Sequence, residues 1–167
     1  MKMIDVGEKQ RMERVAVARG FVAMAPATVR IVRRGESEKG DVIAASRLAG
    51  IMAAKRTQDL VPLCHPIALS GVDVEATPRR GGIEIRATVR TVDRTGVEME
   101  ALAAVCAGCL TVYDMLKRYE RGMRIEGIEL LEKKGGRSGH WRRARADRSR
   151  ASSLSAPRPR PPRRAAR

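Results

Sequence analysis

Apolar and polar residues alternate through residues 13–24, ERVAVARGFVAM, and several of the apolar positions are β-branched. This pattern predicts a half-buried β-strand. The segment ATVRIVRRG, which follows Pro26, predicts a short helix that ends at Gly35. Asp41 is a good N-cap for a second helix over residues 42–57, where apolar side chains recur at helical spacing.

The second half of the chain begins with two alternating segments, Ala68–Thr77 and Ile83–Val92, which Pro78–Gly82 joins into a predicted β-hairpin. Residues 97–122 then predict a long helix that ends at Gly122. A last strand is expected over Met123–Leu131.

The order of these elements is strand, two helices, hairpin, long helix and strand. A chain with this order is expected to fold as an α+β sandwich, in which the helices cover one face of an antiparallel sheet. Glu132–Gly139 is expected to form a loop after the last strand.

Positive charge is concentrated at one end of the chain. The 167 residues include 34 Lys and Arg against 19 Asp and Glu, a formal net charge of +15. Residues 142–167 hold ten Arg, one Asp and four Pro with a single Leu, which predicts a disordered Arg/Pro-rich tail. Residues 1–141 have the length of one domain, and this domain has to explain the function.

Several classes of protein fit the composition poorly. The longest nearly apolar stretch, Ala101–Tyr113, is short for a membrane span, and no secretory signal is visible. Three cysteines do not make a disulfide framework, so we expect a reducing, cytoplasmic setting. A nucleic-acid-binding module would place aromatic residues among its cations, whereas the chain has only four aromatics and its excess charge lies in the tail.

The first candidate site is a rigid loop, Pro62–Pro66, which holds Cys64 and His65 between two prolines. Such restraint suits the positioning of a ligand, although a purely structural turn is an equal alternative. A zinc site is not favoured, because Cys64 and His65 are adjacent and Cys106 and Cys109 lie on an apolar helix. No metal ligand is therefore assigned.

The second candidate site lies on the predicted long helix. Asp114 and Lys117 share one helix face, and Asp114 follows a long uncharged stretch, where we expect the helix still to be buried. The pair is either a surface ion pair or a proton-transfer pair with shifted pKa values. The segments Lys39-Gly40-Asp41 and Lys133–Gly139 add cations and glycines. Together these residues suggest acid/base chemistry on a phosphorylated, polyanionic small molecule.

Five segments make a specific resemblance possible: KGDV (39–42), AGIMAAKRTQDLVPLCHP (49–66), RTGVEMEALAAV (94–105), TVYDMLK (111–117) and EKKGGRSG (132–139). They resemble, in order over about residues 3–143, the cyclic pyranopterin monophosphate synthase family, also called molybdenum cofactor biosynthesis protein C. This resemblance implies a ferredoxin-like protomer in a homohexamer, a trimer of dimers with active sites at subunit interfaces. It also implies a lyase that converts 3′,8-cyclo-7,8-dihydroguanosine 5′-triphosphate into cyclic pyranopterin monophosphate and diphosphate.

The resemblance also assigns residues. Those similar to the family's catalytic positions are Asp114, Lys117 and Lys39. Those that match its substrate-binding positions are Leu63, Cys64, His65, Met99, Glu100, Glu98, Arg14, Lys55 and Lys133. No cofactor is firmly implied, and Mg²⁺ accompanying the triphosphate is left open.

The sequence departs from the family pattern at two points, and two alternative functions remain open. Arg137 stands where the family pattern has Lys, and Gly108 stands in a stretch that usually reads as Ser and Ala. Gly108 costs its helix about 1 kcal/mol relative to Ala unless close packing offsets it. The alternatives are a basic nucleic-acid-binding protein and a non-catalytic, oligomeric interaction protein.

Overall fold

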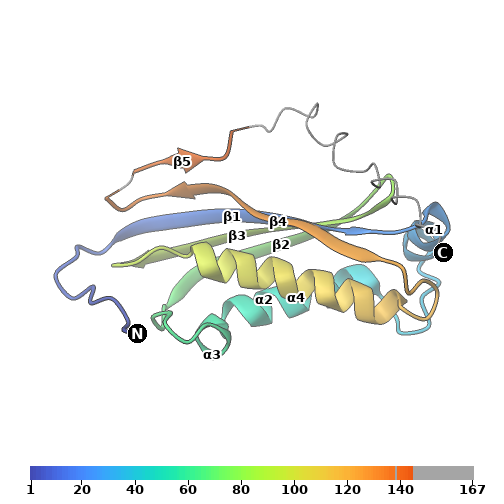
Figure 1. Ribbon diagram of the computed structural model, residues 1–167, viewed down its shortest axis with the longest axis horizontal. Helices are drawn as coiled ribbons and strands as arrows, with labels where there is room; N and C mark the ends of the chain where they lie inside the picture. Colours follow the sequence, from blue (N-terminus) through green and yellow to red (C-terminus); the bar gives the residue numbers. More distant parts are fainter. Residues whose placement is uncertain (138, 145–167) are drawn as a thin grey trace, which may run out of the picture.

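The computed structural model describes residues 1–137 and 139–144 of the chain. Its elements are, in chain order, β1 (Met12–Ala23), α1 (Pro26–Arg34), α2 (Val42–Ala54), α3 (Thr57–Leu60), β2 (Leu69–Arg79), β3 (Gly82–Asp93), α4 (Glu98–Leu116), β4 (Arg124–Lys134) and β5 (Trp141–Arg142). Helices α2 and α4 form a layer on one face of the sheet (Figure 1).

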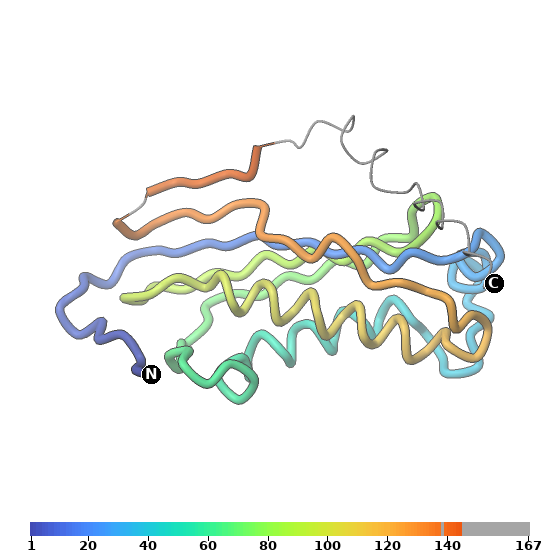
Figure 2. Tube along the Cα trace, viewed as in Figure 1, coloured from blue at the N-terminus to red at the C-terminus, as the bar shows by residue number. Residues whose placement is uncertain are grey.

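The five strands form one antiparallel sheet in the order β2-β3-β1-β4-β5. The first four strands have the ferredoxin-like order, and β5 adds a short edge strand beside β4. Figure 2 shows the strands side by side in this order, from β5 and β4 through β1 to the hairpin of β2 and β3. The predicted fold class, an α+β ferredoxin-like sandwich, is confirmed.

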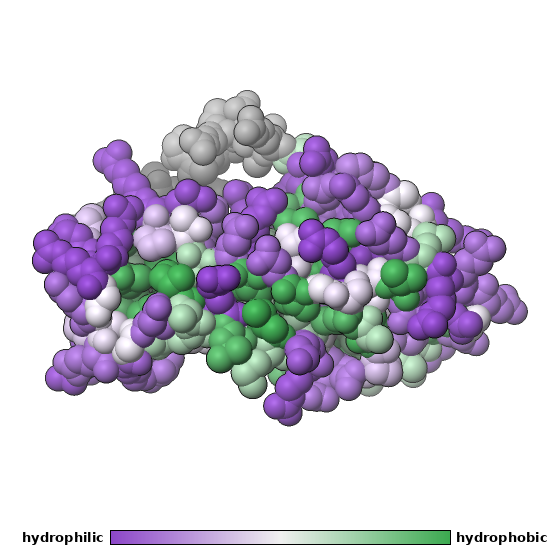
Figure 3. All heavy atoms as spheres, turned by 180° about the vertical axis from the view of Figure 1, so that it is seen from behind, coloured by the Kyte–Doolittle hydropathy of each residue, from purple (hydrophilic) through white to green (hydrophobic). Residues whose placement is uncertain are grey.

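Helices α2 and α4 run antiparallel, because the start of α2 lies beside the end of α4. Close packing of the two helices requires small residues: a Cβ on Gly50 would lie 3.0 Å from the backbone oxygen of Ala104. The outer side of this layer keeps apolar side chains exposed, and these are Leu48, Met52 and Leu110. On the face seen in Figure 3, hydrophobic residues gather in the middle and hydrophilic residues at both ends.

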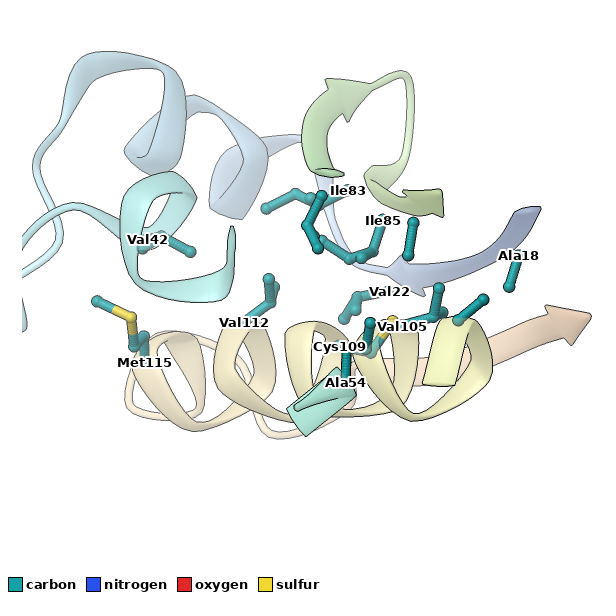
Figure 4. Packing of buried hydrophobic residues seen from close by; sticks show 14 of the residues in the cluster. Ala18, Val22, Val42, Ala54, Ile83, Ile85, Val105, Cys109, Val112 and Met115 are labelled. Carbon is teal, nitrogen blue, oxygen red and sulfur yellow. The ribbon is translucent and has the colours of Figure 1, made fainter. Parts of the chain in front are cut away.

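The core lies between this helical layer and the sheet. Figure 4 shows Val105, Cys109 and Val112 of α4 directed toward Val22 and Ile85 of the sheet, and all five side chains are fully buried. By length and composition alone, α4 is a helix that could cross a membrane. Half of it is buried inside the protein, as in the core helix of a globular domain.

The predicted long helix was wrong at its C-terminal end, since α4 ends at Leu116 and not at Gly122. The backbone N–H groups of Tyr119 and Glu120 both donate to the Leu116 oxygen, which closes the last turn. The Glu120 carboxylate then accepts from Ala25 N and Thr28 Oγ1 at the start of α1. Tertiary bonds therefore end the helix before its glycine signal.

Two further boundaries differ from the prediction. Helix α2 ends at Ala54, because Thr57 Oγ1 donates back to the oxygens of Ala53 and Ala54 and a separate short helix, α3, follows. The expected loop 132–139 begins too early, since residues 132–134 remain in β4 and pair with β1.

Strand β5 is the element that the sequence pattern missed. Its Arg142 is the first residue of the predicted tail, and it pairs with Glu132 of β4. Residues 145–167, which make up most of that tail, lie outside the described residues. Their disorder, and the division at residue 141, stay predictions.

Candidate functional site

The residues assigned to catalysis come together at the C-terminal end of α4. The Asp114 carboxylate lies between two ammonium groups: Lys39 Nζ is 2.6 Å from Oδ2, and Lys117 Nζ is 2.8 Å from Oδ1. Lys39 Nζ also donates to the backbone oxygen of Asp114 at 3.2 Å. We call Lys39, Asp114 and Lys117 the lysine–aspartate cluster.

Local sequence signals place Lys39 in this cluster. Asp41 caps α2 through a 2.9 Å bond from Ala44 N to Oδ1, and Gly40 takes a positive φ of 95° that permits the turn into the cap. Lys39 therefore stands at the start of α2, next to the end of α4. Glu38, which precedes Lys39, forms an ion pair with Arg118 after the end of α4, and the backbone N–H of Glu38 donates to the Tyr119 hydroxyl.

The side chain of Asp114 is 53% exposed, so the expectation that the helix would still be buried there was wrong. Asp114 lies on the outward side of the last helical turn, while Met115 and Leu116 face the core. Hydrogen bonds from Lys117 and Lys39 lower the pKa of Asp114 to about 2, and the same carboxylate raises the pKa of Lys117. The cluster therefore holds one carboxylate and two cations at neutral pH.

A second group of assigned residues gathers at the other end of α4. Lys133 Nζ of β4 lies 3.2 Å from Glu98 Oε1 in the first turn of the helix. Glu100 is 4% exposed, and its Oε2 has no hydrogen-bond partner among the described residues. Burial, and to a lesser extent the charge of Glu98, raises the pKa of Glu100. We call Glu98, Glu100 and Lys133 the glutamate cluster.

Arg14 lies on the same side of the sheet as Lys133 and is nearly buried, with 8% exposure. Its guanidinium donates to the backbone oxygens of Asp93 and Arg94. These two residues lie at and just after the end of β3, shortly before the first turn of α4. A cavity of about 690 Å³ opens beside Arg14, and its lining combines the cations Lys9 and Arg137 with the acids Asp5 and Glu8. Lys9 was missed because a single lysine in an irregular N-terminal segment has no pattern that marks it.

The rigid loop is a turn followed by irregular backbone. Cys64 N donates to the Val61 oxygen, which closes the turn, and Cys64 and His65 are half-buried. Burial, with a smaller contribution from the charge of Glu100, raises the pKa of the Cys64 thiol. The loop therefore lies on the glutamate-cluster side of the molecule.

Outside the lysine–aspartate cluster, three more assigned residues have exposed side chains. Leu63 and Met99 are 48% and 40% exposed, and Met99 lies between the two glutamates of the cluster in sequence. Lys55 is exposed at the C-cap of α2 and lines a hollow of about 340 Å³ between α2 and β2.

The two clusters lie far apart within one chain. Sixteen residues of α4 separate Glu98 from Asp114, which corresponds to about 24 Å along the helix axis. The long helix runs between these two ends in Figure 2. The described residues therefore do not bring all of the assigned side chains into one pocket.

Chemically, the lysine–aspartate cluster holds a carboxylate and two ammonium groups within proton-transfer distance of one another. The glutamate cluster offers a buried, uncompensated carboxyl group and nearby cations. Among residues 1–137 and 139–144, no group of three or more His, Cys, Asp or Glu is placed to hold a metal ion.

Comparison with known proteins gives consistent matches. The MoaC family model matches residues 3–136. The cyclic pyranopterin monophosphate synthase of Thermomicrobium roseum is 58% identical over 144 residues, which cover 85% of this chain and 87% of the relative. The synthase of the same name from Methylobacterium sp. (strain 4-46) is 59% identical over 141 residues, with coverages of 83% and 88%.

Proposed function

The chain belongs to the MoaC family, and on this basis we propose that it is a cyclic pyranopterin monophosphate synthase, a lyase of molybdenum cofactor biosynthesis. Its substrate is 3′,8-cyclo-7,8-dihydroguanosine 5′-triphosphate. The products are cyclic pyranopterin monophosphate and diphosphate. The observation in this structure that best supports the chemistry is the Asp114 carboxylate between Lys39 and Lys117.

Rearranging a guanine into a pyranopterin requires protons to be moved in sequence at several atoms of the ring. Asp114, ionised at neutral pH, accepts a proton from the substrate, and Lys117 or Lys39, each less than 3 Å from this carboxylate, donates one. Because the Asp114 carboxylate raises the pKa of Lys117, loss of the Asp114 charge upon protonation makes Lys117 a better proton donor.

Cations at the opposite end of α4 suit the triphosphate. Lys133 and Arg14 are held in place by Glu98 and by backbone oxygens, so they are preorganised for an anion. They stabilise the negative charge that develops on the departing diphosphate. His65, on the adjacent loop, is a further donor to the same anion.

One small substrate has to reach both clusters, although about 24 Å of helix separates them within a chain. We propose that a second copy brings its glutamate cluster next to the lysine–aspartate cluster of the first, so that the active site lies at a subunit interface. The exposed apolar side chains of Leu48, Met52 and Leu110 support such a contact on the helical layer. The proposed assembly is a homohexamer, a trimer of dimers.

We also propose that the enzyme works in a reducing cytoplasm. All three cysteines are unpaired, and burial raises the pKa of the Cys109 thiol to about 12, so this thiol is inert to oxidation. Cys106 and Cys109 are both free thiols on α4.

The proposed activity is tested by incubating the purified protein with the cyclo-dihydroguanosine triphosphate and following diphosphate release and pyranopterin formation. The synthase from Thermomicrobium roseum serves as the positive control. We expect both products to form at the same rate. Absence of turnover under conditions in which that control is active would refute the proposed function.

Asp114→Asn tests the residue assignment in the same assay. We expect substrate binding to be retained and turnover to fall by roughly 10²–10⁴-fold, the usual contribution of a general acid or base. Asp73→Asn, on the sheet face away from the helices, is the matched control and should leave the rate unchanged. An unchanged rate for Asp114→Asn would show that this carboxylate does not move the proton.

A further inference from the structure

The sheet face that carries no helices has a hollow lined by two glutamates and a phenylalanine. Phe21 of β1 is the register partner of both Glu84 in β3 and Glu126 in β4, so the three side chains form one row across adjacent strands. A hollow of about 310 Å³ lies over this row, with Gly20 and Gly127 in its lining. The Phe21 ring lies against Gly82 at the start of β3.

This hollow has the chemistry of a guanidinium site. Glu84 Oε1 accepts from Arg79 at 2.9 Å, and Glu126 Oε2 lies 3.4 Å from Arg124, so each carboxylate keeps a second oxygen free of bonds among the described residues. A carboxylate accepts at several lone-pair positions, and an aromatic ring attracts an arginine above its face. Arg19, also in the lining, is neutralised by Glu129 at 2.6 Å.

The C-terminal segment already pairs its arginines with the glutamates of β4. Arg142 lies 3.2 Å from Glu132, and Arg143 lies 3.1 Å from Glu129. Arg143 also donates from its backbone N–H to the Leu131 oxygen. The next acidic residue along β4 in this direction is Glu126, which no arginine of the described C-terminal segment reaches.

The direction of β5 and the length of the segment that follows it would allow that segment to reach Glu126. Strand β5 is antiparallel to β4, so a segment that extended β5 along the same edge would run from Leu131 toward Glu126. These five residues of β4 span about 17 Å, and five residues after Arg143 lead to Arg148. Arg145 and Arg150 flank it, and residues 145–167 contain eight Arg and one Asp.

We propose that residues 145–150 dock along β4 and place the Arg148 guanidinium in the hollow between Glu84, Glu126 and Phe21. The docked segment continues the arginine–glutamate pairing that β5 begins. It also covers the outer edge of β4 beyond β5, where an unpaired strand edge would otherwise be exposed. The active site is on the opposite side of the sheet, so this interaction does not depend on the proposed function.

Limited trypsin digestion of the full-length protein tests the proposal, because trypsin must extract each arginine from its contacts before it cleaves. The bonds after Arg148 and Arg150 are compared with the bond after Arg164, which is expected to be free. At low salt, we expect cleavage after Arg148 and Arg150 to be at least about tenfold slower than after Arg164, as measured by mass spectrometry. High salt should remove most of this difference.

The variant Glu84→Gln/Glu126→Gln should raise the rates after Arg148 and Arg150 to that after Arg164. The matched control is Asp73→Asn/Glu75→Gln, which removes two charges from the same face of β2 outside the hollow, and it should retain the protection. Equal cleavage of all three bonds in the unmodified protein, or protection that survives the Glu84/Glu126 variant, overturns the proposal. Protection that disappears on dilution would assign the hollow to the tail of another molecule and would also overturn it.

Discussion

At the scale of single residues, the proposed chemistry depends on Asp114 and on the two lysines that bind its carboxylate. A residue pair at i and i+3 on a helix is usually a weak surface ion pair. Here a third residue, Lys39, which precedes α2, binds the second oxygen of the Asp114 carboxylate. The sequence spacing predicts the pair of Asp114 and Lys117. The catalytic role of Lys39 was assigned only from the family resemblance.

The titration of Asp114 provides a direct test of this geometry. In the folded protein the pKa of Asp114 is about 2, below its ordinary value near 4, chiefly because of the hydrogen bond from Lys117. In Lys117→Met, we expect the pKa to rise toward the ordinary value, as measured by NMR of the carboxyl carbon. A pKa that does not move would show that Lys117 does not hold the carboxylate in solution.

The sign of the linked stability change follows from the lowered pKa. The ionised carboxylate stabilises the folded state at pH values above about 4, and this contribution is lost as the pH falls from about 4 to about 2. Lys117→Met should therefore lower the unfolding midpoint at pH 7 and leave it nearly unchanged at pH 2. The effect should be small, because the three side chains are about half exposed.

At the scale of elements, the small residues of α4 explain how the helical layer fits the sheet. A Cβ on Gly108 would lie 3.0 Å from Cγ2 of Ile85 in β3 and 3.4 Å from the Ser46 oxygen in α2. Close packing on two sides thus offsets the cost that glycine imposes on a helix. A larger residue at this position would force Ile85 or α2 to move away.

Gly108→Val should destabilise the protein by about 1–3 kcal/mol, the usual cost of overfilling a packed core. Ala107→Val, one residue earlier and half-buried, is the control and should cost only a few tenths of a kcal/mol from helix propensity. Urea denaturation of both variants measures the difference. Equal midpoints for the two variants would mean that the space around Gly108 is not tightly filled.

Hydrophobic periodicity predicted most elements correctly, because β1, α1, the hairpin and α4 each bury one regular face. It failed where tertiary hydrogen bonds decide a helix boundary. The end of α4 is one case, because Glu120 lies outside the helix and its carboxylate accepts hydrogen bonds from the start of α1. It also failed at β5, whose two residues are held by Glu132 and by backbone pairing with β4. No local pattern within Trp141–Arg142 could have indicated that pairing.

At the scale of the whole molecule, the net charge of +15 has two separate parts. The cations near the two clusters suit a small polyanion, while most of the excess belongs to the segment after residue 141. A nucleic-acid-binding role is not needed to explain either part. The family match ends at residue 136, before this segment begins.

Deleting residues 144–167 should therefore leave turnover and assembly intact, because no assigned catalytic or binding residue lies there. The deletion protein and the full-length protein can be compared by diphosphate release and by gel filtration. A smaller assembly after the deletion would contradict this expectation and give the tail a structural role.

Within one chain, the residues assigned to the site do not meet in a single pocket. Sequence motifs predicted which residues belong to the site, and the structure places them in two clusters at opposite ends of α4. Spacing along the sequence cannot say which residues of one copy meet which residues of another. The proposed interfacial site is therefore best tested with two copies that carry different defects.

The most direct measurement is the turnover of mixed oligomers that contain Asp114→Asn and Lys133→Ala subunits, obtained by co-expression with two tags. Each variant alone should be inactive, whereas random mixing should restore up to about a quarter of the unmodified activity, since some interfaces then combine two intact clusters. Co-expression of Asp114→Asn with Lys117→Ala, which damage the same cluster, should restore none. We predict activity in the first mixture and none in the second. A first mixture that is no more active than its separate variants would contradict an active site shared between two subunits.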